Sequence, residues 1–383
     1  MTPTPPRINP FRPTFGVSPT ILAGRDSLLE SFRLGLAEGP GSPFRALLIS
    51  GARGMGKTVM LNEFEDAAAE QGWVKLRAYP DRTMLDILIN TSLPEAIRDQ
   101  TGPSNKRMIS GVSITGLGQV TSMADPDHSH PAPTLISRLR ELAALLRQRG
   151  VGILITLDEL QSAEIDQLHE LATAVQDLLR DDFDIALVAA GLPEGIGKLL
   201  QHEGTTFIRR AERIHLSEVN QTDAVAMFSE TTTAGGRHID AEAAHLAATI
   251  SVGYPYSMQL TGSLAWARAT LDRTDHITAT QVSAVRDEVI RRMGMQVHGP
   301  SLHSVPDGEL TILYAIAELS ENNEMVATGA IAALMQVETN ALSMQRRQLL
   351  RRGLLTVPKY GYLNFTLPYM REYLLNNPQH RPL

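Results

Sequence analysis

The chain has 383 residues, a formal net charge of −7 and 43% hydrophobic residues. This length exceeds what one hydrophobic core usually contains, so we expect two or three domains. The negative charge excludes a polycationic protein, so any contact with nucleic acid must come from a local basic patch. The chain has no cysteine, which excludes disulfides and thiol catalysis and is typical of the reducing cytoplasm.

Membrane attachment is not expected from the sequence. Residues 1–7 lack the apolar core of a signal peptide. The longest apolar runs, near residues 151–157 and 185–192, have the length of a β-strand and are too short to cross a bilayer. We therefore expect a cytoplasmic protein with no membrane partner.

The first 216 residues contain an arm followed by an α/β pattern. Residues 1–20 are rich in proline and threonine and are expected to form an extended or disordered N-terminal arm. A helix with apolar residues at every third or fourth position follows at residues 28–36. From residue 46 to about residue 216, strands and helices alternate, which indicates a mostly parallel sheet with helices on both faces. The expected strands are 46–50, 73–79, 151–157, 184–190 and 213–216.

One segment interrupts this alternation. Residues 101–133 are rich in Gly, Ser, Pro and His, and we interpret them as an insertion or a mobile loop. Within them, residues 112–117 alternate apolar and polar side chains, which predicts a hairpin or an edge strand.

The pattern changes twice beyond residue 216. Residues 217–297 have a wholly helical pattern, and residues 298–383 contain three predicted helices and then two short strands around a turn. That order predicts a winged helix. The sequence therefore divides into an arm (1–20), an α/β core (21–216), an all-α lid (217–297) and a winged-helix domain (298–383).

A complete phosphate-binding loop of the pattern G-x-x-x-x-G-K-T lies at residues 51–58. It follows a predicted buried strand and precedes a predicted helix, so its backbone N–H groups and the helix dipole should converge on an anion. Gly51, Gly54 and Gly56 allow positive φ and let the backbone approach phosphate without a Cβ in the way. The fold class that follows is a P-loop NTPase with a parallel sheet, an all-α lid and a winged helix.

The side chains of this loop predict ATP and Mg²⁺ as cofactors. Lys57 is placed to bind the β- and γ-phosphates, and the Thr58 hydroxyl is placed to bind Mg²⁺. The residues expected to bind the nucleotide here are Gly51, Gly54, Met55, Gly56, Lys57, Thr58 and Val59.

A second motif supplies the acidic half of the site. Residues 152–157 form an apolar strand that ends in Asp158 and Glu159. Asp158 is expected to hold Mg²⁺, directly or through a water molecule, and Glu159 to act as general base on the attacking water. Lys57, Asp158 and Glu159 are thus the predicted catalytic residues. No Asn-Lys-x-Asp guanine motif and no Leu-Ser-Gly-Gly-Gln transporter motif occurs in the sequence, so adenine is the expected base.

The order of these motifs resembles that of AAA+ and related signal-transduction ATPases, in the branch with origin-recognition-like and archaeal ATPases. The resemblance covers nearly the whole chain. Its motifs are a Gly-Arg-Asp box (24–26), the phosphate loop, the Asp-Glu strand, Ala-Ala-Gly-Leu-Pro (189–193), an arginine-rich segment, Gly-Tyr-Pro-Tyr (253–256) and the winged helix.

The resemblance implies further site residues. It places Arg25 near the adenine and Pro255 of the lid against the nucleotide. It also places Arg209, Arg210 and Arg213 where such proteins often carry an arginine finger; a solvated basic stretch is the alternative.

Two features of the family pattern are missing here. A polar sensor residue is expected at the end of the strand 184–190, where the sequence has Ala189, Ala190 and Gly191. A second sensor, an arginine in the lid, is expected near residues 256–259, where no arginine occurs. With fewer fixed partners for charge on the γ-phosphate, we expect a slow switch ATPase and not a fast motor.

The C-terminal module is the expected place for a DNA contact. Residues 339–383 contain seven Lys or Arg residues against one acid, Glu372. Helix geometry puts Arg346 on the inner apolar face and Arg347 and Arg351 on the outer face. Arg347, Arg351 and Lys359 on the wing are the predicted DNA contacts. Because winged helices also contact proteins, both kinds of partner remain open.

These observations predict an ATP-binding protein, a slow Mg²⁺-dependent ATPase that couples its nucleotide state to the winged helix. Two alternatives remain. One is a nucleotide-gated DNA-binding regulator that barely hydrolyses ATP. The other is a signalling scaffold that oligomerises on ATP and contacts itself or another protein. The expected partners are therefore ATP or ADP, with double-stranded DNA or protein as the macromolecular partner.

Overall fold

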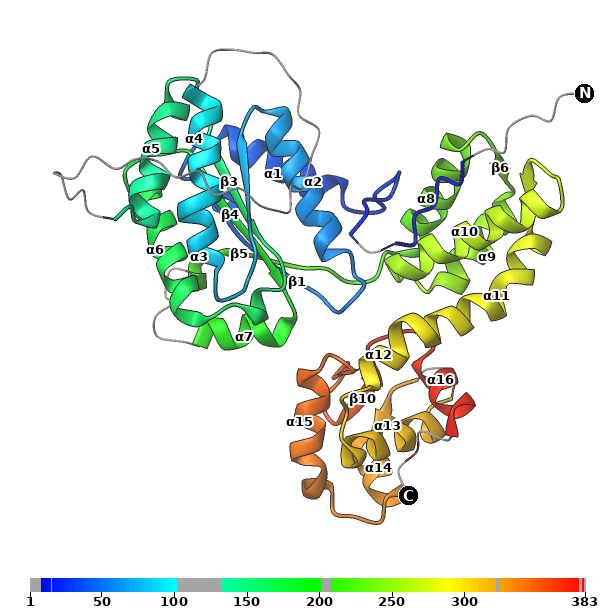
Figure 1. Cartoon of the computed structure of the whole chain (residues 1–383). Coiled ribbons are helices and arrows are strands. Elements are labelled where there is room, and N and C mark those ends of the chain that lie inside the picture. The colour runs from blue at the N-terminus through cyan, green and yellow to red at the C-terminus, as the bar shows by residue number, and fades with distance from the viewer. Residues whose placement is uncertain are drawn as a thin grey trace, which may run out of the picture.

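The computed structural model describes residues 8–14, 16–101, 132–201, 208–321, 324–378 and 381. The predicted insertion, with its hairpin or edge strand at 112–117, lies almost entirely outside these residues. The described chain forms an α/β body, a group of long helices beside it, and a C-terminal unit below both (Figure 1). No helix among the described residues has the length and apolar character needed to cross a membrane.

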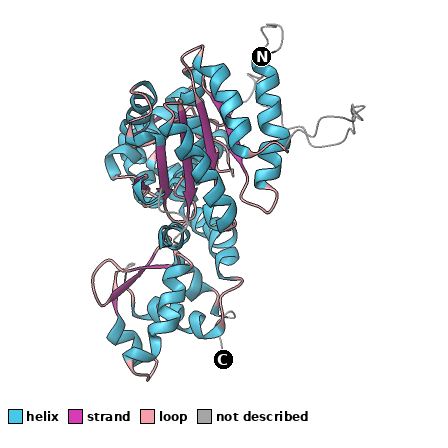
Figure 2. Ribbon diagram, turned by 90° about the vertical axis from the view of Figure 1, so that its left-hand side faces the viewer, coloured by secondary structure: helices cyan, strands magenta, loops and turns pink. Residues whose placement is uncertain are grey.

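The α/β body contains one five-stranded parallel sheet in the order β2-β3-β4-β1-β5. All five predicted strands are confirmed to within two residues at each end. In Figure 2 they run side by side through the upper body, with helices on both sides. The strands are β1 (Ala46–Ser50), β2 (Val74–Ala78), β3 (Ile153–Leu157), β4 (Ile185–Gly191) and β5 (Glu212–His215).

The two faces of the sheet bury separate sets of helices. Successive side chains of a strand point to opposite faces. Val188 of β4 therefore packs with α1 (Asp26–Ala37) and α2 (Lys57–Glu70), whereas Leu187 packs with α5 (Leu135–Arg147) and α6 (Ile165–Arg180). Because both faces are covered, β3 and β4 are apolar apart from Thr156 of β3. The shorter helices on the second side are α3 (Met84–Ile87), α4 (Leu93–Thr101) and α7 (Pro193–Gln201).

The helical segment that follows packs four helices together. They are α8 (Gln221–Ala234), α9 (Ala241–Ser251), α10 (Pro255–Leu271) and α11 (Ala279–Met293). The prediction of a wholly helical segment missed one feature, a parallel pair of two-residue strands, β6 (His238–Ile239) and β7 (His276–Ile277). Such short strands carry too few residues to show an alternating pattern in the sequence.

The N-terminal arm is docked on this helical segment. Residues 8–14 and 16–20 contain no helix or strand, but they are not a disordered tail. Phe11 is 4% exposed, with its ring centroid 6.0 Å from that of Phe228 of α8. The side-chain amide of Asn9 donates to the carbonyl and the hydroxyl of Ser263 in α10. The arm thus crosses the helical segment before it enters the α/β body at α1.

The C-terminal unit combines helices with a small antiparallel sheet in the order β8-β10-β9. Its elements are α12 (Gly299–Leu302), α13 (Asp307–Leu319), β8 (Val326–Ala327), α14 (Thr328–Leu334), α15 (Ser343–Arg351), β9 (Leu355–Thr356), β10 (Tyr362–Phe365) and α16 (Met370–Asn376). The third predicted helix begins with a 3₁₀ turn at Thr339–Leu342, and Gly353 with φ +67° follows its end.

Two helices of this unit begin without a side-chain cap. Asp307 is the first residue of α13 and makes no cap hydrogen bond, because Pro306 occupies the N-cap position. Thr328 likewise begins α14 after Ala327. Its hydroxyl instead donates to the Gly361 carbonyl over 2.9 Å and ties the helix to the β9–β10 turn.

A π-helical turn, Gly294–His298, joins α11 to the C-terminal unit. It ends at His298, whose side chain is fully buried against the ring of Tyr373 in α16. Burial lowers the pKa of His298 to about 4, because the buried imidazole is more stable neutral than charged.

This buried histidine predicts an acid-sensitive junction. In the unfolded chain the pKa returns to about 6.5, so the stabilisation is complete above that pH and is lost as the pH falls towards 4. By pH 5 the loss should reach about 2 kcal/mol. Thermal melting of His298→Phe should show a correspondingly smaller loss between pH 7 and pH 5 than the parent. His303→Phe, at an exposed histidine, should behave like the parent; equal slopes for all three proteins would contradict the assignment.

Candidate nucleotide site

The phosphate loop lies between the end of β1 and the start of α2. Gly54 and Gly56 have φ of +76° and +85°, as predicted, and Gly56 is the N-cap of α2. Gly51 does not use this freedom, because its φ is not positive. Glycine is needed there for space, because a Cβ would lie 3.0 Å from the Leu216 carbonyl oxygen. The helix therefore begins at Lys57 with its first N–H groups directed into the loop.

Lys57 is held inside the loop. Its side chain is 6% exposed, and its Nζ donates to the carbonyl oxygens of Gly51 and Ala52, each over 3.0 Å. Burial lowers the pKa of Lys57, while the carboxylates of Glu159 and Asp158 act in the opposite direction. Both predicted acids are thus close enough to influence the ammonium group electrostatically.

The acidic motif meets the loop at Thr58. The Thr58 hydroxyl donates to Oδ2 of Asp158, and the Glu159 N–H donates to Oδ1 over 2.8 Å. A hydroxyl and a carboxylate that share one point beside a phosphate loop are the oxygen ligands that Mg²⁺ prefers. These residues therefore fit a magnesium ion.

Glu159 is held in an unusual conformation. Its backbone is left-handed, with φ +50° and ψ +43°, a region that costs a residue with a Cβ about 1–2 kcal/mol. Its carboxylate accepts a hydrogen bond from the Gln161 side-chain amide. Backbone strain of this kind is often found at functional sites.

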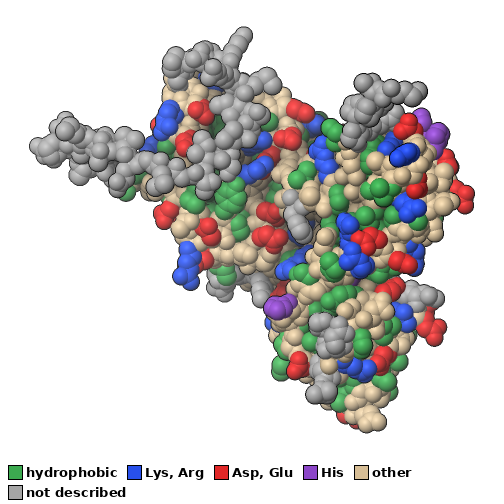
Figure 3. Space-filling view, turned by 45° about the vertical axis from the view of Figure 1, so that its right-hand side comes forward, with side chains coloured by type: hydrophobic (Ala, Val, Ile, Leu, Met, Phe, Trp, Pro, Cys, Tyr) green, Lys and Arg blue, Asp and Glu red, His purple; other side chains and the backbone are tan. Residues whose placement is uncertain are grey.

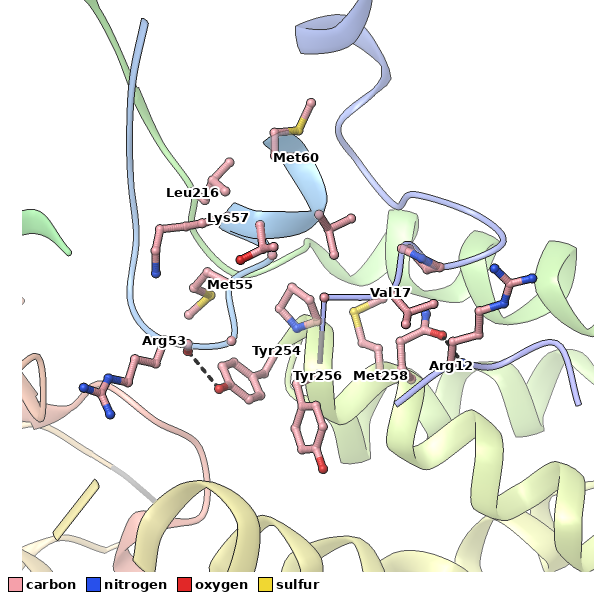
Figure 4. A pocket seen from close by; sticks show the side chains of 18 of the residues that line it. Arg12, Val17, Arg53, Met55, Lys57, Met60, Leu216, Tyr254, Tyr256 and Met258 are labelled. Carbon is pink, nitrogen blue, oxygen red and sulfur yellow. Dashed lines mark hydrogen bonds between the residues drawn. The ribbon is translucent and has the colours of Figure 1, made fainter. Parts of the chain in front are cut away.

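A cavity of about 520 Å³ adjoins the loop and brings three parts of the chain together. Figure 4 shows the phosphate loop with Lys57 and Met55 on one side and the N-terminal arm and α10 on the other. A volume of this size suits a small-molecule ligand. Of the predicted nucleotide residues, the lining includes Arg25, Gly54, Met55, Gly56, Lys57, Thr58, Val59, Glu159 and Pro255.

The sequence reading missed several lining residues. The cavity wall also contains Arg53, Tyr254 and Tyr256, together with arm residues such as Arg12 and Val17. Tyr254 and Tyr256 flank Pro255, so the lid motif gave a signal for them. The sequence contains no signal for the arm residues, because only the tertiary fold places them near the phosphate loop.

Tyr254 joins α10 to the phosphate loop. Its hydroxyl donates to the Arg53 carbonyl over 2.8 Å (Figure 4). Burial raises the pKa of Tyr254, so the hydroxyl remains protonated and able to donate. A Cβ on Gly54 would lie 1.9 Å from the Tyr254 hydroxyl oxygen. Glycine at residue 54 is therefore needed for this contact as well as for the left-handed turn.

Arg25 reaches the start of the lid. Its guanidinium donates to the Ser217 carbonyl over 2.5 Å. Burial lowers the pKa of Arg25, and the nearby Asp223 partly opposes that effect. Arg25 thus lines the cavity and also connects the start of α1 to the segment before α8.

The predicted arginine finger is not part of this cavity. Arg209 donates to the Leu200 carbonyl over 2.7 Å, and Arg213 donates to the Arg209 carbonyl over 3.2 Å. Arg209 and Arg210 are exposed and do not line the described cavity. Their role as an arginine finger therefore stays a prediction.

The three predicted DNA contacts lie in different surroundings. Arg347 is exposed on α15, and Lys359 is exposed with its Nζ 5.6 Å from the centre of the Tyr362 ring. Arg351 is instead ion-paired over 3.4 Å with Glu194 of α7. The structure thus turns Arg351 towards the α/β body, and its prediction as a freely available DNA contact needs that correction.

Residues 21–186 match a family model described as an AAA ATPase domain, and residues 295–374 match a domain of unknown function (DUF8462). No curated protein matches the chain in sequence.

Solved structures resemble the chain over nearly its whole length. The ORC2 protein of Aeropyrum pernix, described as ADPNP–ADP complexes, is 17% identical with a TM-score of 0.61; 96% of this chain and 97% of that chain are covered. The Walker-type ATPase PABY2304 of Pyrococcus abyssi is 13% identical with a TM-score of 0.63, and 92% and 96% are covered. Residues 21–186 therefore contain an AAA ATPase domain with a P-loop, and the chain as a whole shares the fold of these two solved structures.

Proposed function

We propose that the cavity binds ATP with Mg²⁺ and that the protein hydrolyses ATP slowly to ADP and phosphate. The observation that carries this proposal is the convergence of Lys57, Glu159 and the Thr58–Asp158 pair at one end of the cavity. A positive charge, a base and a metal-binding pair at the start of a helix are the parts that phosphoryl transfer to water requires.

Each residue has a distinct task in this proposal. The N–H groups at the start of α2 hold the phosphate oxygens, and Lys57 exchanges its two carbonyl partners for the β- and γ-phosphates. Thr58 and Asp158 hold Mg²⁺, which supplies neutralisation of the phosphate charge. Glu159 orients the attacking water and accepts its proton.

The other end of the cavity suits an adenosine. Apolar side chains of the arm and of α10, among them Val17 and Met258, line it beside the ring of Tyr256. Arg25 and Pro255 complete the wall and are proposed to contact the nucleotide. In support, the similar Aeropyrum pernix protein is described in complexes with ADPNP and ADP.

We expect slow turnover because few polar or cationic side chains surround the place proposed for the phosphates. At the end of β4 the strand offers only Ala189, Ala190 and Gly191, and no arginine lines the lid side of the cavity from α10. Calorimetry with Mg-ATP and phosphate-release kinetics test the proposal together. We expect binding, with turnover below about 10 s⁻¹ for the protein alone. Absence of any binding heat would refute it, and binding without turnover would favour the non-hydrolysing regulator.

We further propose that the nucleotide state controls the C-terminal unit. The proposal includes the division of the chain near residues 20, 216 and 297, with the last part acting as a winged helix. Tyr256 of α10 donates to Gln296 in the π-helical turn, which continues into that unit. A movement of α10 at the cavity is thereby passed to α15, whose Arg351 holds Glu194 of the α/β body.

DNA is the second candidate partner, and the exposed cations Arg347 and Lys359 favour it. Basic and acidic side chains are interspersed over the face seen in Figure 3, so a DNA contact would be confined to a small surface. If Arg347 and Lys359 each neutralise one phosphate, log affinity should fall with log salt at a slope of about −1.8. Arg347→Ala should reduce that slope to about −0.9.

Fluorescence anisotropy with duplex DNA at several salt concentrations measures this. Arg273→Ala, at an exposed arginine at the far end of α10, serves as the matched control and should leave the slope unchanged. A flat salt response of the parent protein would exclude DNA and leave a protein partner, including a second copy of the chain, for the C-terminal unit.

A further inference from the structure

Gln161 connects the predicted base to the end of a neighbouring strand. It follows β3 in a 3₁₀ turn, Leu160–Ser162, directly after Glu159. Its side-chain amide nitrogen donates to Oε2 of Glu159. Its amide oxygen accepts the N–H of Leu192 over 3.0 Å, at the point where β4 ends and α7 begins.

These two hydrogen bonds fix the orientation of the amide. A backbone N–H can only donate, so the oxygen of Gln161 must face Leu192. The NH₂ group must then face Glu159, whose ionised carboxylate can only accept. Both ends of the side chain are therefore determined by their partners, and a flipped amide would lose both bonds.

The surrounding residues leave room for this side chain. A Cβ on Gly191 would lie 2.9 Å from the amide oxygen of Gln161, and a Cβ on Gly195 would lie 2.2 Å from its Cβ. The space beside the end of β4, where a polar side chain of the strand would stand, is thus filled by Gln161 from the β3 side.

We propose that Gln161 is a positioning residue for hydrolysis and supplies the polar group that the end of β4 lacks. It holds the Glu159 carboxylate towards the phosphate end of the cavity. Without this hydrogen bond the exposed side chain of Glu159, whose backbone is already strained, would be free to rotate. Gly191 and Gly195 serve this role by leaving the space open. The inference rests on the proposed ATPase function.

Three variants test it. Gln161→Ala removes both bonds, and Gln161→Glu keeps an acceptor for Leu192 but places a second carboxylate beside Glu159. Both should lower kcat by about 10- to 100-fold, with the KM for ATP and the Kd for ADP changed by less than about twofold, because Gln161 does not line the cavity. The matched control Gln176→Ala, at an exposed glutamine of α6, should leave kcat unchanged.

A double-mutant cycle separates positioning from a general structural effect. In single-turnover measurements, Gln161→Ala should cost less than about twofold in the Glu159→Gln background, because its action passes through Glu159. Equal losses with and without Glu159, or an unchanged or raised kcat in Gln161→Ala, would overturn the inference while the ATPase stands. Absence of turnover in the parent protein would instead contradict the proposed function itself.

Discussion

Replacing Glu159 with glutamine should lower kcat by about 10²–10⁴ while leaving ATP bound. The change keeps the size of the side chain and its hydrogen-bonding reach but removes the group that accepts the proton of the attacking water. Glu159 lies beside Lys57 and not among the apolar residues that are proposed to surround the adenine. Affinity for ATP should therefore change by less than about threefold. Phosphate release and the retention of labelled ATP on the protein measure the two effects.

The matched control is Glu170→Gln, which removes one exposed carboxylate from α6 and should preserve turnover. If Glu159→Gln hydrolyses ATP at the parental rate, Glu159 is not the base. If the parent protein itself retains ATP unhydrolysed, the protein is a nucleotide-gated regulator, and the variant should then change little.

Replacing Lys57 with methionine should weaken ATP binding by about 10²–10⁴. The ammonium group is buried and has two hydrogen bonds to exchange for phosphate oxygens, and each bond to a charged group contributes about 1.5–3 kcal/mol. A loss of about 3–6 kcal/mol corresponds to that range of affinity. Methionine retains the packing of the stem, so the fold should persist. Calorimetry with Mg-ATP and Mg-ADP gives the measurement.

Lys75→Met provides the control, since this lysine is exposed on β2 and pairs with Asp66 over 3.5 Å. It should bind ATP as the parent does. A Lys57→Met protein that melts normally and binds ATP with parental affinity would mean that the phosphates lie elsewhere.

The α/β body was predictable because its signals are local. A strand buried on both faces is apolar along nearly its whole length, so β3 and β4 stand out in the sequence. A phosphate loop needs glycine at fixed positions between a strand and a helix, so its place in the chain was also readable. The order of the strands in the sheet, with β4 between β3 and β1, was not predicted. The resemblance to origin-recognition-like ATPases added the lid and its Gly-Tyr-Pro motif.

The features of the site and the surface that the sequence did not predict depend on contacts between distant segments. Val17 meets the cavity only because Asn9 and Phe11 fasten the arm to α10 and α8. Arg351 has the helical phase of an outer-face residue, yet α7 supplies a partner for it, Glu194. No periodicity within one helix reveals a partner that comes from another part of the fold.

The Tyr254 hydrogen bond attaches one end of α10 to the phosphate loop. The helix has 17 residues, a length of about 25 Å, and it is fastened to the phosphate loop at its first turn by Tyr254. A tilt of about 10° at that fixed end would displace the far end by about 4 Å. If loss of one phosphate tilts α10 at its fixed end, the far end of the helix would therefore move further than the loop does.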